Sequence, residues 1–147
     1  MAETNSLTAA PLQCVVVTPE ATVIDTPAEF VALPLFDGEV GIAPGRSPLI
    51  GRLGFGELRI RHGRAAETRM YVDGGFVQVA DNVVSVLTNR AIPANSLDTS
   101  VAQEQLRSAL ASHAAGDQEM AIRDRLISQA RGQLRVARRA EFTGTAV

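Results

Sequence analysis

Residues 36–48 carry the sequence Phe-Asp-Gly-Glu-Val-Gly-Ile-Ala-Pro-Gly-Arg-Ser-Pro, the most conformationally restricted segment of the chain. Asp37-Gly38 and Pro44-Gly45 are turn dipeptides, because Gly reaches positive φ without steric cost and Pro presets φ for the first turn position. Between them, Val40-Gly41-Ile42 predicts a very short strand. A rigid surface segment of this kind is typical of a binding loop. The same turn chemistry also suits an ordinary pair of strand connections.

The chain around this segment, from residue 12 to 95, is predicted to be a β domain. Short runs of β-branched and aromatic residues alternate there with turn signals. We expect tight turns at Asp73-Gly74-Gly75 and Asp81-Asn82, and strands at 12–17, 21–26, 30–35, 57–61, 69–72, 76–80 and 83–87. Many short strands joined by tight turns favour an antiparallel sandwich or a flattened barrel.

The periodicity changes at Leu97 from that of strands to that of helices. Asp98, Thr99 or Ser100 is suited to cap a first helix, and Gly116-Asp117 predicts its end and the start of a second. Apolar residues recur every three or four positions, at Ala102, Leu106, Ala109, Leu110 and Ala114 and then at Met120, Leu126, Ile127, Ala130, Leu134 and Ala137. The short link predicts an antiparallel hairpin. Its Ala-rich seam buries little area, so we expect the hairpin to be mobile.

These patterns predict an α+β protein, with an N-terminal antiparallel β-sandwich followed by a C-terminal antiparallel two-helix hairpin. We place a flexible tail at 1–11, the sandwich at 12–95, the hairpin at 96–140 and a second flexible tail at 141–147. No apolar run approaches the roughly 20 residues of a membrane span, and the first ten residues lack the pattern of a signal peptide. A single cysteine, Cys14, fits a reducing compartment.

Charge is distributed unevenly along the 147 residues, although the formal net charge is only -2. That balance argues against a general nucleic-acid binder, which needs a basic surface. Six arginines lie in the second predicted helix, at Arg123, Arg125, Arg131, Arg135, Arg138 and Arg139. The cluster suits either a solvated helix face or docking onto an acidic protein surface, because a guanidinium pairs with a carboxylate through two parallel hydrogen bonds.

Residues that could form a catalytic or metal site are scattered. His62 and His113 have no carboxylate or thiol at the spacing of a metal site. Ser47 lacks a nucleophile-elbow sequence, and the glycines of 51–56 lack the Lys-Ser/Thr of a phosphate loop. We therefore predict a protein that is not an enzyme and uses no metal or cofactor. The alternatives are a small ligand-binding sandwich module with a helical tail and a nucleotide-sensing regulator.

Four sequence motifs resemble those of a known family. They are Gly38-Glu39-Val40-Gly41-Ile42-Ala43-Pro44-Gly45-x-x-Pro48, Tyr71-x-x-Gly74-Gly75-Phe76-x-x-Val79, Asn82-x-Val84-x-Val86-Leu87 and Gln133-Leu134-Arg135-Val136-Ala137. In this order, and with a β half followed by a helical half, the chain resembles the epsilon subunit of bacterial and chloroplast F-type ATP synthases, the counterpart of the mitochondrial delta subunit. The resemblance runs from about residue 12 to 140.

The resemblance implies a noncatalytic rotor subunit of the central stalk, which couples the gamma subunit to the c-ring during ion-driven ATP synthesis. The helical hairpin of the family inhibits ATP hydrolysis by extending beside gamma toward the alpha and beta subunits, which assigns the six arginines to docking there. The implied location is the cytoplasmic face of the inner cell membrane, as a peripheral protein that reaches the membrane only through the c-ring.

The resemblance also implies which residues contact gamma and the c-ring: Glu39, Ile42, Pro44, Gly45, Arg46 and Pro48. Arg46 departs from the family, where a His is common, although a guanidinium still offers a donor and a positive charge. Some members bind ATP through Leu/Ile-Asp-x-x-Arg-Ala at the first helix. Val101 replaces that Arg here, so we expect weak or no ATP binding.

Overall fold

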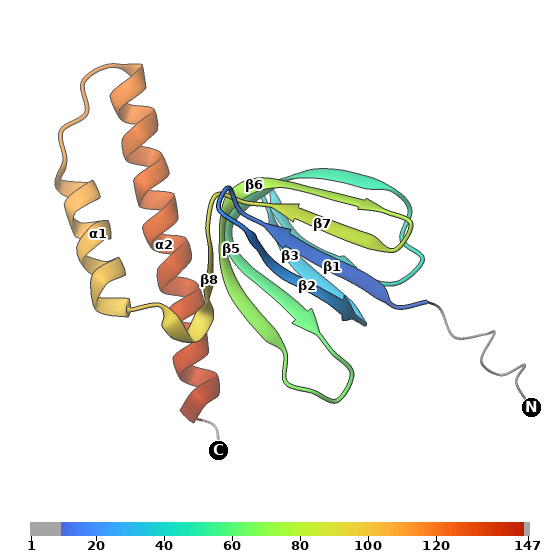
Figure 1. Ribbon diagram of the computed structural model, residues 1–147. Helices are drawn as coiled ribbons and strands as arrows, with labels where there is room; N and C mark the ends of the chain where they lie inside the picture. The colour runs from blue at the N-terminus through green and yellow to red at the C-terminus, as the bar shows by residue number, and fades with distance from the viewer. Residues whose placement is uncertain (1–9, 146–147) are drawn as a thin grey trace, which may run out of the picture.

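A computed structural model of the chain describes residues 10–145, with side chains through Glu141. Eight strands are followed by a 3-10 turn and two helices, and Figure 1 shows the helices standing beside the strands as a separate hairpin. The elements are β1 (Leu12–Val17), β2 (Thr22–Ala28), β3 (Phe30–Leu35), β4 (Gly38–Ile42), β5 (Leu49–Arg61), β6 (Thr68–Ala80), β7 (Val83–Leu87), β8 (Ala91–Pro93), η2 (Ala94–Ser96), α1 (Thr99–Ala111) and α2 (Asp117–Thr145). The predicted α+β order of a sandwich and then a helical hairpin is confirmed.

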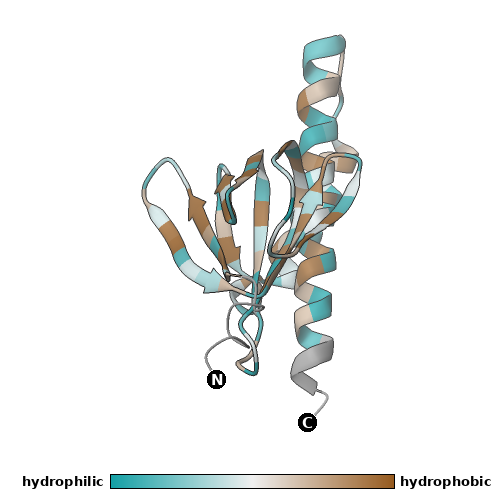
Figure 2. Cartoon of the chain, turned by 90° about the vertical axis from the view of Figure 1, so that its right-hand side faces the viewer, coloured by the Kyte–Doolittle hydropathy of each residue, from teal (hydrophilic) through white to brown (hydrophobic). Residues whose placement is uncertain are grey.

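The strands form a sandwich because the sheet folds over on itself. Their order is β2-β1-β7-β6-β5-β3-β4, with β8 also paired to β6. All pairs are antiparallel except β1 with β7, which run parallel. Apolar and polar residues alternate along the strands, as the alternating colours of Figure 2 show. The inward side chains, among them Leu12, Leu33, Leu58 and Val84, are buried in one continuous core.

The predicted hairpin turn at Asp73-Gly74-Gly75 is wrong. β6 runs through these residues as one strand of 13 residues, and it pairs in a single register with β5, from Leu49↔Val79 to Ile60↔Thr68. Gly74 and Gly75 do have positive φ, of 70° and 108°. A Cβ at Gly75 would overlap the Leu87 carbonyl oxygen. The glycines therefore bend a continuous strand so that it serves both layers of the sandwich.

The other predicted turn is present. Asp81 and Asn82 both have positive φ, of 51° and 62°, and join β6 to β7 as expected. The strand predicted at 57–61 is longer in the structure, because β5 begins at Leu49 and includes the glycine-rich residues 51–56. Both long strands thus pass through a glycine-rich segment without a break.

The helical hairpin is attached to the sandwich through α2. α1 packs on the side of α2 that faces away from the strands (Figure 1). Asp98 caps α1, its side chain accepting from the Ser100 and Val101 amides. α1 ends at Ala111, before the predicted stop at Gly116. α2 continues to Thr145, where the sequence predicted a flexible tail from residue 141; residues 1–9 of the other predicted tail lie outside the described residues.

Only part of the predicted apolar stripe of the hairpin is covered. Ala102 and Ala109 of α1 are buried, and so are Ile127, Ala130, Leu134 and Ala137 of α2. Leu110, Met120 and Leu126 are about half exposed, at 45%, 52% and 49%. The buried seam consists mostly of alanines, so the packing between the helices is shallow, as the sequence predicted.

Candidate partner-binding rim and hairpin interface

The loop between β4 and β5 forms a fixed rim at one end of the sandwich. Gly45 has φ of 84°, and its amide donates to Asn82 Oδ1 at 2.8 Å. The Asn82 carbonyl oxygen accepts from the Gln13 amide, also at 2.8 Å. The loop is thereby tied to the β6–β7 turn and to β1. Arg46 and Pro48 project from this rigid base into solvent, and Pro44 is half-buried.

Two of the six residues predicted to contact gamma and the c-ring lie away from this rim. Ile42 is fully buried in the sandwich core, so it supports the rim from beneath. Glu39 lies near the other end of β4, paired with Pro34 of β3. Its carboxylate, on a side chain 56% exposed, forms an ion pair with Arg59 at 2.6 Å. The structure thus brings Pro44, Gly45, Arg46 and Pro48 together and places Glu39 beside the hairpin.

The hairpin docks where β5 and β6 bend. Gly132 of α2 lies so close to β5 that a Cβ there would be 2.7 Å from the Phe55 carbonyl oxygen. Next to this approach, Tyr71, Ala94 and Val136 form a small buried cluster, with Phe55, Ile92, Leu97 and Ala140 around it. This second core is much smaller than the core of the sandwich, so apolar burial holds the hairpin only weakly.

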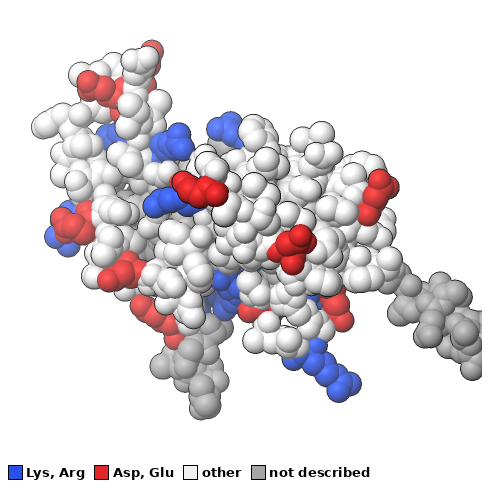
Figure 3. Space-filling view, in the orientation of Figure 1, with Lys and Arg blue, Asp and Glu red and all other residues white. Residues whose placement is uncertain are grey.

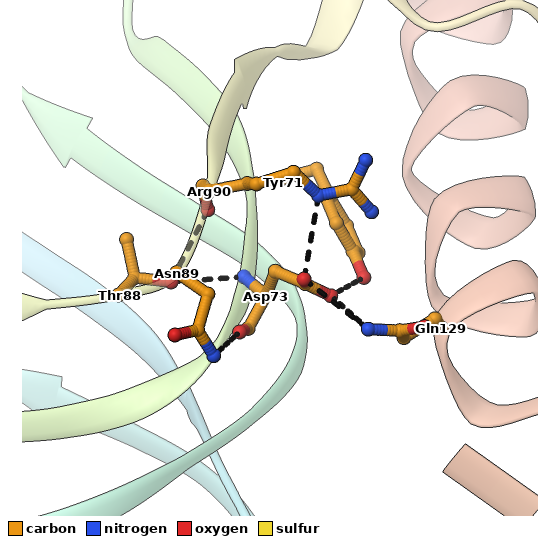
Figure 4. Close-up of polar contacts among 6 residues, drawn as sticks. All are labelled: Tyr71, Asp73, Thr88, Asn89, Arg90 and Gln129. Carbon is orange, nitrogen blue, oxygen red and sulfur yellow. Dashed lines mark hydrogen bonds and ion pairs between the residues drawn. The ribbon is translucent and has the colours of Figure 1, made fainter. Parts of the chain in front are cut away.

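Polar contacts add to this small core, and most converge on Asp73 (Figure 4). The residue is 3% exposed, and its carboxylate accepts from three different parts of the chain. Tyr71 donates its hydroxyl at 2.7 Å, Arg90 its Nε at 3.3 Å and Gln129 of α2 its Nε2 at 3.1 and 3.2 Å. Buried carboxylates need such partners. α2 therefore supplies one donor of a satisfied polar network.

The same network fixes the segment that leads out of the sandwich toward the helices. The Asp73 amide donates to Thr88 Oγ1 at 3.0 Å, and Asn89 Nδ2 donates to the Asp73 carbonyl oxygen at 3.1 Å. Burial and the hydrogen bond to Asp73 raise the pKa of Tyr71 above its ordinary value, so this hydroxyl keeps its proton. The residues of the motif Tyr71-x-x-Gly74-Gly75 thus form part of the surface of the sandwich against which α2 packs.

Glu57 of β5 forms a second polar anchor. Its side chain is only 9% exposed. Arg69 lies 3.3 Å from the carboxylate, Arg139 of α2 3.5 Å and Arg59 3.6 Å. A single carboxylate is shared by arginines from β5, β6 and α2. α2 covers this face, and one of its arginines, Arg139, therefore also contacts the Glu57 carboxylate.

The six arginines of α2 have different surroundings. Arg123 donates to the carbonyl oxygens of Ala109 and Leu110, and so satisfies the C-terminus of α1. Arg135 donates to the Phe55 carbonyl oxygen at 3.3 Å, and Arg139 contacts Glu57. Arg123 is half-buried, whereas all five others are exposed: Arg125, Arg131, Arg135, Arg138 and Arg139. In the space-filling view, basic side chains lie on the hairpin and along its junction with the sandwich (Figure 3).

An exposed apolar face on the sandwich was missed by the sequence predictions. Phe36, Ile50, Phe76 and Leu87 are 69%, 77%, 59% and 52% exposed. Phe76 pairs across the sheet with both Arg52 and Leu87, and the Arg52 guanidinium lies 4.6 Å from the centre of the Phe36 ring. The alternation of Phe76 with buried Val77 and Val79 was the available signal. Apolar patches of this kind mark interaction sites.

The arrangement defines a class of protein: a small binding subunit, with a rigid rim, an exposed apolar sandwich face and a helical hairpin held by a small apolar cluster and polar contacts. The comparisons agree with this class. Residues 11–94 match the family model for the beta-sandwich domain of the ATP synthase delta/epsilon chain. The ATP synthase epsilon chain of Rhodopirellula baltica is 51% identical over 127 residues, covering 86% of this chain and 98% of the relative. That of a Synechococcus strain is 34% identical, covering 88% and 96%. The chain therefore belongs to the ATP synthase epsilon chain family, and it is a noncatalytic subunit.

Solved structures with low sequence identity share the fold. A chain of the mitochondrial ATP synthase of Euglena gracilis, solved with OSCP, F1 and the c-ring, gives a TM-score of 0.70 at 20% identity, covering 91% of this chain and 81% of that one. A chain of the central stalk and c-ring of the Tetrahymena thermophila mitochondrial enzyme gives 0.69 at 12% identity, covering 88% and 98%. The sandwich and hairpin are therefore a shared architecture.

Proposed function

We propose that this chain is a rotor subunit of an F-type ATP synthase. Its sandwich binds the gamma subunit and the c-ring, and its hairpin restrains ATP hydrolysis. The observation that carries the proposal is the contrast in attachment: the sandwich has one large core, whereas the hairpin is held by a small cluster around Tyr71 and by polar contacts. The first part is built to transmit force, and the second is built to detach.

The rim is the proposed contact with the c-ring. The exposed residues Arg46 and Pro48 are presented by a loop that is hydrogen-bonded to two other strand ends, so a partner meets a preformed surface. Ile42 acts from the core, and Glu39 contributes at the side next to α2. Rigid attachment suits a subunit that passes rotation from one partner to another.

The exposed apolar face is the proposed contact with gamma. Ile50, Phe76 and Leu87 present large apolar side chains on the neighbouring strands β5, β6 and β7, and Phe36 adds another from the turn after β3. Aromatic anchors with an arginine beside them, here Arg52, are typical of the centre of a protein interface. The face continues into a groove beside Ala121, Arg125 and Ser128 of α2, so a partner on this face also meets the docked hairpin.

The proposed braking action follows from the arginines of α2. Arg125, Arg131, Arg135, Arg138 and Arg139 are exposed while the hairpin is docked, and release from the sandwich also frees Arg135 from the Phe55 carbonyl oxygen and Arg139 from Glu57. An extended helix with this many guanidinium groups matches a partner surface rich in carboxylates. We assign that surface to the alpha and beta subunits.

No helix within residues 10–145 is both long and apolar enough to span a membrane. Membership in the family makes the chain part of a membrane-associated complex. We place it on the cytoplasmic face of the inner cell membrane, with contact to the membrane only through the c-ring.

Two measurements test the proposed function. The full chain is expected to co-purify with gamma, whereas the double variant Phe76→Ser/Leu87→Ser is expected to lose gamma while keeping its melting temperature, because both side chains are exposed. Deleting residues 98–147 is expected to leave an assembled, ATP-synthesising complex with raised ATP hydrolysis. Failure of the intact chain to bind gamma would refute the rotor role, and unchanged hydrolysis after the truncation would refute the braking role.

A further inference from the structure

Glu39 and the arginines of α2 line one groove. Its walls are the segment Pro34–Glu39, residues 54–57 of β5, and Arg131, Arg135 and Arg139 of the helix. These three arginines recur every four residues, so they lie on one face of α2. The groove is therefore the place where the predicted c-ring contact and the hairpin meet.

Ion pairs connect Glu39 to α2 across the sheet. Glu39 contacts Arg59 at 2.6 Å, Arg59 contacts Glu57 at 3.6 Å, and Glu57 contacts Arg139 at 3.5 Å. Arg69, paired with Arg59 across the strands, also contacts Glu57 at 3.3 Å. We call Glu39, Glu57, Arg59 and Arg69 the sheet cluster. It lies on the sandwich, and Arg139 approaches it from the hairpin.

The sheet cluster is balanced in charge. Two carboxylates and two guanidinium groups cancel, so the arginines of α2 meet a neutral surface, on which Arg139 contacts the carboxylate of Glu57. Loss of the charge on Glu39 leaves the cluster with one net positive charge. Without its partner Glu39, Arg59 is left with Glu57 alone, and it competes with Arg139 for that carboxylate. Both effects lower the attraction between the sheet and α2.

We propose that Glu39 is the control point for release of the hairpin: a partner group that neutralises Glu39 shifts the hairpin from docked to released. The proposal rests on the proposed function, which places Glu39 beside the c-ring and makes the hairpin a brake. The device couples two events, because the state of the ring contact is passed through Arg59 and Glu57 to α2. Its basis is electrostatic and needs no movement of the sandwich backbone.

The test measures release in the isolated full chain. Ala94 is 5% exposed and is covered by Val136, so a thiol at this position in an Ala94→Cys background reacts only when α2 leaves. The reaction rate then reports the fraction released, even when that fraction is small. Cys14 does not interfere, because it is buried in the sandwich core and burial raises its pKa to about 12.

Two single variants are expected to change the labelling rate in opposite directions, and their combination is expected to cancel the change. Glu39→Gln is expected to increase the labelling rate roughly two- to fivefold at low salt, the size of a partly exposed ion pair. Arg59→Gln leaves the sheet cluster negative and is expected to slow labelling. The double variant Glu39→Gln/Arg59→Gln restores a neutral cluster and is expected to return to the parent rate. In 1 M salt, where the screening length is about 3 Å, the differences are expected to shrink.

Glu29→Gln is the matched control. Glu29 is an exposed acid that lies 4.0 Å from Arg61, outside the groove, and its loss is expected to leave the labelling rate unchanged. Equal rates for Glu39→Gln and the parent at low salt would overturn the proposal, and so would faster labelling in Arg59→Gln. These measurements use no ATP synthase. If Glu39→Gln releases the hairpin but the truncation leaves hydrolysis unchanged, the charge control stands and the braking role fails.

Discussion

Replacing Gly132 with Ala is expected to detach the hairpin while making its long helix intrinsically more stable. The new Cβ would lie 2.7 Å from the Phe55 carbonyl oxygen and 3.2 Å from Phe55 Cβ. Comfortable contacts between such atoms begin at about 3.5 Å, so α2 has to withdraw by roughly half an ångström or more. That withdrawal stretches the Arg135 contact with the Phe55 carbonyl oxygen, which is already 3.3 Å long.

The magnitude follows from the cost of overpacking, about 1–3 kcal/mol. The docking equilibrium is then expected to fall roughly 5- to 150-fold. In the released hairpin the sign is opposite, because Ala exceeds Gly in helix propensity by about 1 kcal/mol. One substitution therefore weakens docking and strengthens the helix.

The assay combines thiol labelling at Ala94→Cys with circular dichroism. Labelling is expected to accelerate while the helical signal is unchanged or larger. Ser128→Ala, an exposed position one turn earlier on α2, is the control and is expected to label at nearly the parent rate. A labelling rate in Gly132→Ala that equals or falls below the parent rate would show that the close approach to Phe55 does not limit docking.

Three other substitutions test separate parts of the structure. Gln129→Ala removes the only α2 side chain seen, within residues 10–141, to donate to the Asp73 carboxylate. It is expected to weaken docking by about 1–3 kcal/mol, measured by the same thiol labelling. An unchanged labelling rate would contradict the importance of the network in Figure 4 for docking. Ile42→Ala opens a cavity in the core and is expected to lower the free energy of unfolding in urea by about 2–5 kcal/mol, whereas Arg46→Ala on the exposed rim is expected to leave it almost unchanged. Similar losses for the two variants would refute the assignment of Ile42 to structural support and of Arg46 to partner contact. The hydrogen bonds from Ser100 and Val101 lower the pKa of Asp98 in the folded chain. The contribution of Asp98 to the stability of α1 is therefore fully present above the unfolded pKa near 3.8, and it is lost as the pH falls through the lower folded pKa. Asp98→Ala is expected to reduce helicity at pH 7 and to remove this acid-dependent loss.

Local chemistry was sufficient to predict the short strands. The predicted ranges 12–17, 30–35 and 83–87 coincide with β1, β3 and β7, because each is bounded by turn residues and packs a full apolar face. The prediction was wrong at Asp73-Gly74-Gly75. Gly74 and Gly75 have the positive φ that a tight turn would need, but there the chain bends and continues as one strand. Glycines that permit a turn also permit a bend, and only the pairing with β5 selects between them.

The candidate site depended more on tertiary contacts. The sequence indicated the rim and the arginines of α2, but it could not show that Glu39 lies beside the hairpin rather than with Arg46. Glu39 is near the start of β4, whereas Arg46 is in the loop that follows the end of this strand. The functions of Asp73 and Glu57 were also missed. The partners of these acids on α2 are distant in the sequence, and Gln129 is 56 positions from Asp73.

The two bent strands give the sandwich an unusual mechanical property. In a sandwich of two separate sheets, a sideways load on one sheet reaches the other only across the packed core. Here β5 and β6 continue from the layer beneath the rim into the layer beneath α2. The covalent backbone of these two strands therefore carries a shearing load from the rim to the side beneath α2. The load does not have to pass through hydrogen bonds between separate sheets.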